Sequence, residues 1–254
     1  MRSLISAELL KLRSTRSAWI PLAAALAAAV LAVIANTAAA GHGGTPPLSP
    51  AMLPDLLRGS GGQLVDGAVL LAWIVLSAGE FRHRTSVTTF LGQPRRLRVV
   101  SAKLAAAALT GVAVGLLAET FSAATSAATL SAHHVPLAWG QPGVPGTVAA
   151  VPLLAALFGV LGASLGLLLR NTAAAVGLAL MWAFVIKGIL PALIHEPGIS
   201  RWLPEAAANA VLHGASPVAL PVGVALTVLA GYAAVLAGAG AALTARQEIA
   251  TATA

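Results

Sequence analysis

Long apolar runs are the feature that most constrains the fold of this chain. A hydrocarbon core about 30 Å thick is crossed by about 20 residues of helix, so apolar runs of that length predict membrane-spanning helices. We predict six spans, at 19–40, 63–79, 104–130, 147–169, 173–194 and 218–244. The composition agrees, because 58% of the residues are hydrophobic and only 9% are charged, against about one quarter charged in a soluble domain. We expect one all-α, polytopic transmembrane domain over 1–254.

The basic residues predict how the spans are oriented. Loops rich in Lys and Arg stay in the cytoplasm. In the six-span arrangement one side carries only Arg58 and Arg201 outside the runs. Both termini are therefore predicted to be cytoplasmic, and the net charge of +7 needs no nucleic-acid partner. The basic residues of the predicted cytoplasmic side are Arg2, Lys11, Arg13, Arg16, Arg82, Arg84, Arg95, Arg96, Arg98, Lys103, Arg170 and Arg246.

The first apolar run has a second interpretation. Its end, Thr37-Ala-Ala-Ala, is similar to the small-residue cleavage site of a secretory signal peptide. The run is longer than the usual 7–15 apolar residues of such a peptide, which favours a retained span. N-terminal sequencing of the mature protein distinguishes the two, because cleavage would leave Gly41 as the first residue.

The segment before the first run predicts a helix that lies on the membrane surface. It has apolar residues at helical spacing with charged residues between them, which is typical of an interfacial amphipathic helix. A basic flank that only sets the topology is the alternative. The residues concerned are Ile5, Leu9 and Leu12 on the apolar face, and Glu8, Lys11 and Arg13 between them.

The cytoplasmic loop after the second run predicts a second short helix. Thr85 or Ser86 can cap it, and Gly92 with Pro94 ends it. Such a helix between two spans offers an apolar face to a partner, whereas the alternative is a solvated basic loop. The face consists of Val87, Phe90 and Leu91.

The order of these parts resembles the permease, or membrane subunit, of ABC-2 type transporters. The matching residues are Glu8-Leu-Leu-Lys-Leu-Arg-Ser-Thr-Arg before the first span, Glu80-Phe-Arg-His-Arg-Thr-Ser-Val after the second, a Pro-Arg-Arg motif, and Ala102-Lys entering the third. Ile199-Ser-Arg-Trp-Leu-Pro-Glu-Ala-Ala also resembles the external hairpin of the family. Arg84 is a departure, since family members often have glycine there.

The resemblance implies three functional segments. Residues 1–17 would form the interfacial elbow helix, 80–103 the coupling loop that contacts an ATP-hydrolysing subunit, and 195–217 the external hairpin. The elbow residues would be Leu9, Lys11, Leu12 and Arg13, and the coupling residues Glu80, Arg82, Thr85, Val87, Phe90 and Leu91.

The resemblance also implies an ATP-driven exporter of the cell membrane, in which two permease copies pair as a homodimer. ATP and Mg would bind to the separate ATP-binding subunit, because this chain has no Gly-x-x-x-x-Gly-Lys-Ser/Thr phosphate-binding loop. No cofactor is expected on this chain, and it is not expected to be an enzyme. Its substrate would be a small molecule or lipid, which the sequence does not identify.

Two charged residues, Glu119 and Lys187, lie inside predicted spans. A charge at the centre of a span is unfavourable by about 2.5–3.5 kcal/mol, so such residues usually face a protein interior or a wet cavity. They could line a cavity as a pair, or each could lie near the end of a tilted helix, where a lysine reaches the interface. An ion- or proton-coupled carrier that uses them, and a non-transporting scaffold, are the competing functions.

Two pairs of glycines are candidates for close helix packing, and four histidines are candidates for a metal site. Gly111 and Gly115, like Gly162 and Gly166, have the Gly-x-x-x-Gly spacing, which allows helices to pack closely either between copies or within one chain. The histidines lack the spacing of a metal site, and no metal is expected. With no cysteine and no catalytic motif, catalysis is not expected either. The histidines are His133, His134, His195 and His213.

Overall fold

The computed structural model describes residues 1–82, 95–186, 189, 200–214 and 219–252, with the backbone alone for 59–63, 185–186 and 245–252. This part of the chain contains helices and no strand, which confirms the all-α expectation. The α-helices are α1 (Arg2–Ser14), α2 (Arg16–Ala39), α3 (Leu53–Arg82), α5 (Arg96–Ala132), α6 (Val144–Leu169), α7 (Thr172–Met181), α10 (Pro204–His213) and α11 (Val222–Ala252). A 3-10 turn, η1 (Pro50–Met52), precedes α3, and a π-helical turn, η2 (Trp182–Ile186), follows α7.

Within the described residues, five helices are long and apolar enough to cross a membrane. They correspond to five of the six predicted spans. The sixth, predicted at 173–194, is described only in part, as the short helix α7 followed by η2. A helical membrane protein is therefore supported, and the number of spans stays a prediction. The five segments are Arg16–Ala39, Leu64–Arg82, Arg96–Ala132, Val144–Leu169 and Val222–Thr244.

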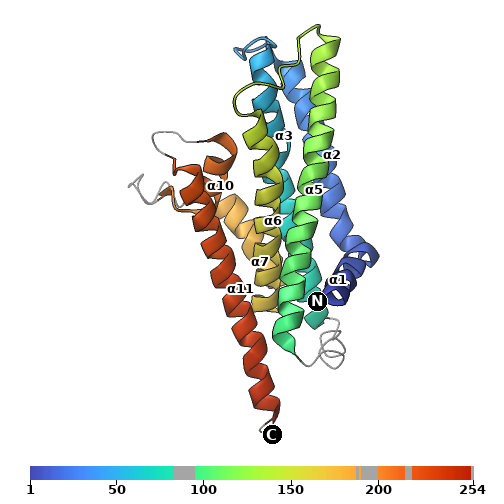
Figure 1. The fold of residues 1–254 in the computed structure, drawn as a ribbon, viewed down its shortest axis with the longest axis vertical. Coiled ribbons are helices and arrows are strands. Elements are labelled where there is room, and N and C mark those ends of the chain that lie inside the picture. Colours follow the sequence, from blue (N-terminus) through green and yellow to red (C-terminus); the bar gives the residue numbers. More distant parts are fainter. Residues whose placement is uncertain (83–94, 187–188, 190–199, 215–218, 253–254) are drawn as a thin grey trace.

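Helices α2, α3, α5 and α6 lie side by side along the length of the molecule, and α11 runs obliquely beside α6 (Figure 1). Helix α1 lies across one end of this bundle. Both termini lie toward that same end (Figure 1). The main core is built on α3, where Val69 and Trp73 are fully buried against α2, α5 and α6. A second core joins α6 to α10 and α11 through residues such as Leu154, Val211 and Leu229.

Close backbone packing holds α3, α5 and α6 together. A Cβ atom added to Gly115 of α5 would lie 2.6 Å from the Cα of Pro152 in α6, and one added to Gly111 would meet the backbone of Ala155. Further along α6, a Cβ at Gly162 would lie 2.9 Å from the Cα of Leu70 in α3. Both Gly-x-x-x-Gly pairs thus serve contacts within the chain. We call Gly111, Gly115, Gly162 and Gly166 the glycine seam.

Helix α3 begins at Leu53, ten residues before the second predicted span. Its first turns bury Leu53, Leu56 and Leu57 against Leu130 and Val144, which form a small apolar cluster at one end of the bundle. Tertiary packing therefore extends the helix through a stretch whose charged residues interrupt the apolar pattern. Of the predicted external hairpin, the structure describes the helix α10, which packs against α11 and α6.

Candidate functional site

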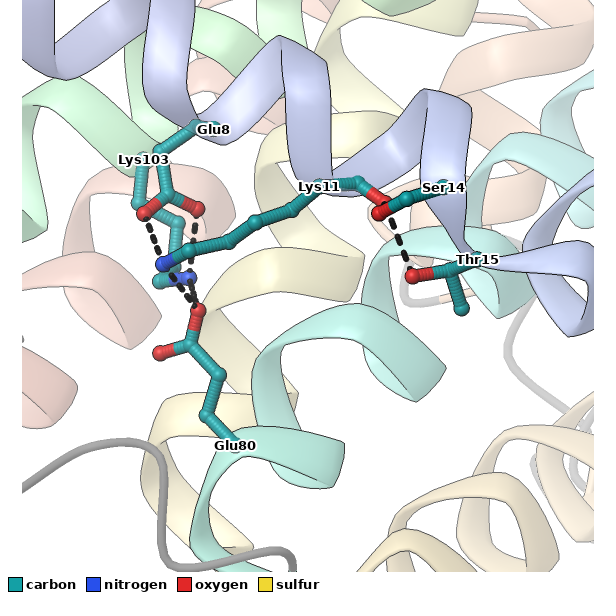
Figure 2. A network of polar contacts seen from close by, with 6 residues as sticks. All are labelled: Glu8, Lys11, Ser14, Thr15, Glu80 and Lys103. Atoms are coloured by element: carbon teal, nitrogen blue, oxygen red, sulfur yellow. Dashed lines mark hydrogen bonds and ion pairs between the residues drawn. The ribbon is translucent and has the colours of Figure 1, made fainter.

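A buried network of two lysines and two glutamates joins three helices (Figure 2). The Lys103 side chain is 2% exposed, and its Nζ donates to Glu8 Oε2 at 2.8 Å and to Glu80 Oε1 at 2.7 Å. Lys11 Nζ donates to Glu8 Oε1 at 2.7 Å and to Glu80 Oε1 at 2.8 Å. Each ammonium thus bridges both carboxylates. Such closed pairing is what allows charges to stay in a poorly solvated place.

The positions of the helices explain why these four residues meet. Glu8 and Lys11 are three residues apart on α1, so they share one face of that helix. Glu80 lies in the last turn of α3, and Lys103 lies near the start of α5. The same side of α1 buries Leu12 and packs Ile5 and Leu9 against the main core. The predicted apolar face of this helix is therefore docked on the bundle, with the ion network beside it.

The charges around Glu8 and Lys11 favour the ionised form of both side chains. Burial alone would raise the pKa of Glu8, but Lys103 and Lys11 outweigh it and hold that pKa below its ordinary value of 4.5. For Lys11, burial alone would lower the pKa, while Glu80 and Glu8 together raise it above its ordinary 10.5. The docking of α1 is thus strongest while both groups are ionised.

We expect the network to stabilise the protein between about pH 4.5 and pH 10.5, because a lowered glutamate pKa contributes stability above 4.5 and a raised lysine pKa contributes it below 10.5. The stability from Glu8 is lost as the pH falls through its lowered pKa, and that from Lys11 as the pH rises through its raised pKa. The measurement is the difference in Tm between the wild type and Glu8→Gln across pH. A difference that persists unchanged well below pH 4 contradicts the assignment.

Some of the predicted elbow and coupling residues are in contact in the structure, and others lie outside the residues that it describes. Lys11 of the elbow and Glu80 of the coupling loop are in direct contact, which the sequence did not indicate. Leu9 and Leu12 face the core, whereas Arg13 and Arg82 are exposed. Four coupling residues lie outside the described residues: Thr85, Val87, Phe90 and Leu91.

Two carboxyl groups lie in helices that are long and apolar enough to cross a membrane. Glu119 is 6% exposed and Asp66 is 3% exposed, and neither Glu119 Oε2 nor Asp66 Oδ1 has a hydrogen-bond partner. Glu119 therefore faces the protein interior, and its predicted pairing with Lys187 stays a prediction. Its suggested partner Lys187 lies outside the described residues. Sequence reasoning missed Asp66, although an acidic residue inside an apolar run was a visible signal.

The histidines do not form a site in the described part of the chain. His133, His134 and His213 are exposed, and His195 lies outside the described residues. No group of three or more His, Cys, Asp or Glu side chains there could hold a metal ion.

Comparison with known proteins gave no match, either to a protein-family model or to a curated protein. The likeness to ABC-2 type permeases therefore stays a prediction from the sequence. A functional assignment has to be argued from the charges and contacts of this chain itself.

Proposed function

We propose that this chain is the membrane subunit of an ABC-2 type transporter of the cell membrane. Its six spans place both termini in the cytoplasm, two copies pair around a substrate pathway, and a separate subunit supplies ATP hydrolysis. The direction of transport in this proposal is export. The substrate is a small molecule or a lipid.

The observation that carries this proposal is the ion network between α1, α3 and α5. Glu80 precedes the segment 83–94 and Lys103 follows it, and both bind to Glu8 or Lys11 of α1. A force applied to the coupling loop would therefore reach the surface helix and two spans together. A basic loop that only set the topology would need no such linkage.

The distribution of charge supports the cytoplasmic location of the network. The basic residues Arg95, Arg96 and Arg98 begin α5, at the end of the bundle where both termini lie (Figure 1). The positive-inside rule assigns such an end to the cytoplasm. An ATP-hydrolysing partner would have access to this end.

The test is co-isolation of an ATPase subunit from the native membrane. We expect the ATPase to copurify with the wild type and to be lost when Val87, Phe90 and Leu91 are all replaced by Glu. Leu97→Glu is the matched control, because Leu97 is 59% exposed at the start of α5 and lies outside the proposed contact face. Labelling of residue 90 from outside the cell, or full activity without any ATPase, would refute the proposal.

A proton-coupled carrier is the second candidate, and the buried carboxyl groups favour it. Intramembrane carboxyl groups often belong to proton relays, and Asp66 and Glu119 each keep an oxygen without a hydrogen-bond partner. The isolated chain in proteoliposomes would then move protons down a pH gradient, measured with an internal pH-sensitive dye. Asp66→Asn and Glu119→Gln should each abolish the flux, whereas a dye signal equal to that of empty liposomes excludes this function.

A further inference from the structure

The turn that ends α6 holds a second group of polar side chains, none of which belongs to the ion network. Arg170 follows the last residue of α6 and adopts a left-handed backbone with φ 52°. Its guanidinium lies over the ring of Phe81 at 5.2 Å from the centroid, and Nε donates to the Leu167 carbonyl at 3.4 Å. Nη2 of the same guanidinium is buried and has no hydrogen-bond partner.

A second unsatisfied donor lies two residues further along the chain. The hydroxyl of Thr172, the first residue of α7, is also buried without a partner. Buried donors in native proteins are nearly always paired, and leaving one unpaired is unfavourable. Each of these two donors therefore lacks the acceptor that a buried donor usually has.

The positive charge around this turn indicates that the missing acceptor is an anion. Arg96 at the start of α5 lies near Arg170, and burial together with this second positive charge lowers the pKa of Arg170. Arg96 is held in place by α11, since its Nη1 donates to the Thr244 carbonyl at 3.3 Å. Two guanidinium groups held near each other attract an anion with several acceptor oxygens, for which phosphate is the best match to arginine.

The depth of the cluster in the bilayer indicates where that anion comes from. Arg170 directly follows the apolar segment Val144–Leu169, and Arg96 is the first residue of the apolar segment Arg96–Ala132. Both arginines thus lie where two membrane-crossing helices reach the interface, which is the layer of phospholipid head groups. Basic pockets at this depth are known binding places for anionic lipids.

We propose that Arg170 and Thr172, together with Arg96, form a binding site for the phosphate group of an anionic phospholipid. Arg170 donates through Nη2 and Thr172 through its hydroxyl, while Arg96 adds positive charge. The same chemistry would accept inorganic phosphate from solution. This inference goes beyond the proposed function, because the site does not depend on the chain's being a permease.

The test compares how well the purified full chain retains phosphatidylglycerol over phosphatidylcholine, measured by native mass spectrometry. We expect Arg170→Asn to weaken phosphatidylglycerol binding about tenfold and Thr172→Val about fivefold. Asparagine tolerates the left-handed backbone, so the first variant should still fold. Arg98→Asn is the matched control, because Arg98 is an exposed arginine on the same turn region of α5, and its binding should be unchanged.

A second arm separates the two sources of phosphate. If millimolar inorganic phosphate displaces phosphatidylglycerol from the wild type, the site takes phosphate from solution, and its phosphate chemistry is upheld while the lipid assignment is overturned. If the lipid stays bound and its retention depends on Arg170, the lipid assignment is upheld. Equal retention by the wild type and both site variants, or an equal loss in Arg98→Asn, overturns the proposal altogether.

Discussion

Replacing Lys103 by methionine is expected to destabilise the folded protein by about 3–5 kcal/mol, the range measured when one partner of a buried ion pair is removed. The reason is that Lys103 is almost completely buried and bridges Glu8 and Glu80. Methionine fills a similar volume but leaves both carboxylates with Lys11 alone. Equilibrium unfolding in mixed micelles measures the change in the free energy of unfolding.

Lys11→Met is the matched control for this prediction. Lys11 binds the same two carboxylates, but its side chain is 35% exposed, so water can replace it and we expect a loss of about 1 kcal/mol. The double variant Lys103→Met with Glu8→Gln should recover part of the loss, because Lys11 then has a single carboxylate to neutralise. Equal losses for the two lysines would show that burial does not set the size of the effect. No loss for Lys103→Met would show that the network does not stabilise the fold.

Replacing Gly162 by alanine is expected to destabilise the protein by about 3 kcal/mol, although only one methyl group is added. The new Cβ would collide with the backbone of Leu70 in α3, including its Cα at 2.9 Å. Backbone atoms cannot turn aside as a flexible side chain can, so α3 and α6 would have to separate. The shift in Tm of the purified protein measures the effect.

Gly231→Ala in α11 is the control for Gly162→Ala. No atom lies within 4 Å of a Cβ built at Gly231, and alanine is the better helix former by about 1 kcal/mol, so its Tm should stay equal or rise. A similar fall in Tm for both variants would mean that the loss reflects membrane insertion of any altered helix. It would then say nothing about packing in the glycine seam.

The sequence was sufficient to predict the helical fold and the positions of the five described helices that are long and apolar enough to cross a membrane. The apolar runs are long, and in a bilayer a chain has almost no alternative to a helix. The second span was predicted at 63–79, close to the apolar segment Leu64–Arg82, but the helix α3 itself begins ten residues earlier. Packing of Leu53 and Leu57 continues that helix through a stretch where Asp55 and Arg58 interrupt the apolar pattern. Helix boundaries that depend on tertiary contacts cannot be found from local pattern.

The sequence indicated some residues of the candidate site, but it did not indicate that they are in contact. Glu80 and Lys11 were chosen for their place in separate segments, but their contact depends on how α1 crosses the bundle, which no local pattern contains. Lys103 was noted as a basic residue at the end of the coupling loop and as part of the motif entering the third span, but its burial was not foreseen, and it is the most buried member of the network. The unsatisfied donors of Arg170 and Thr172 depend in the same way on the turn between α6 and α7.

The glycine seam has a consequence for how this molecule can move. Where two helix backbones touch, neither helix can rotate about its axis or slide along it without a steric collision, so α3, α5 and α6 have to travel as one rigid body. Helix α11 has only 17% of its apolar segment buried. At Gly240 an added Cβ would lie 3.5 Å from the Ser164 carbonyl oxygen of α6, which is an ordinary contact and not the collision found in the seam, so small sliding displacements of α11 are sterically allowed. Any conformational cycle of this protein would therefore be a shear of α11 against a fixed three-helix block.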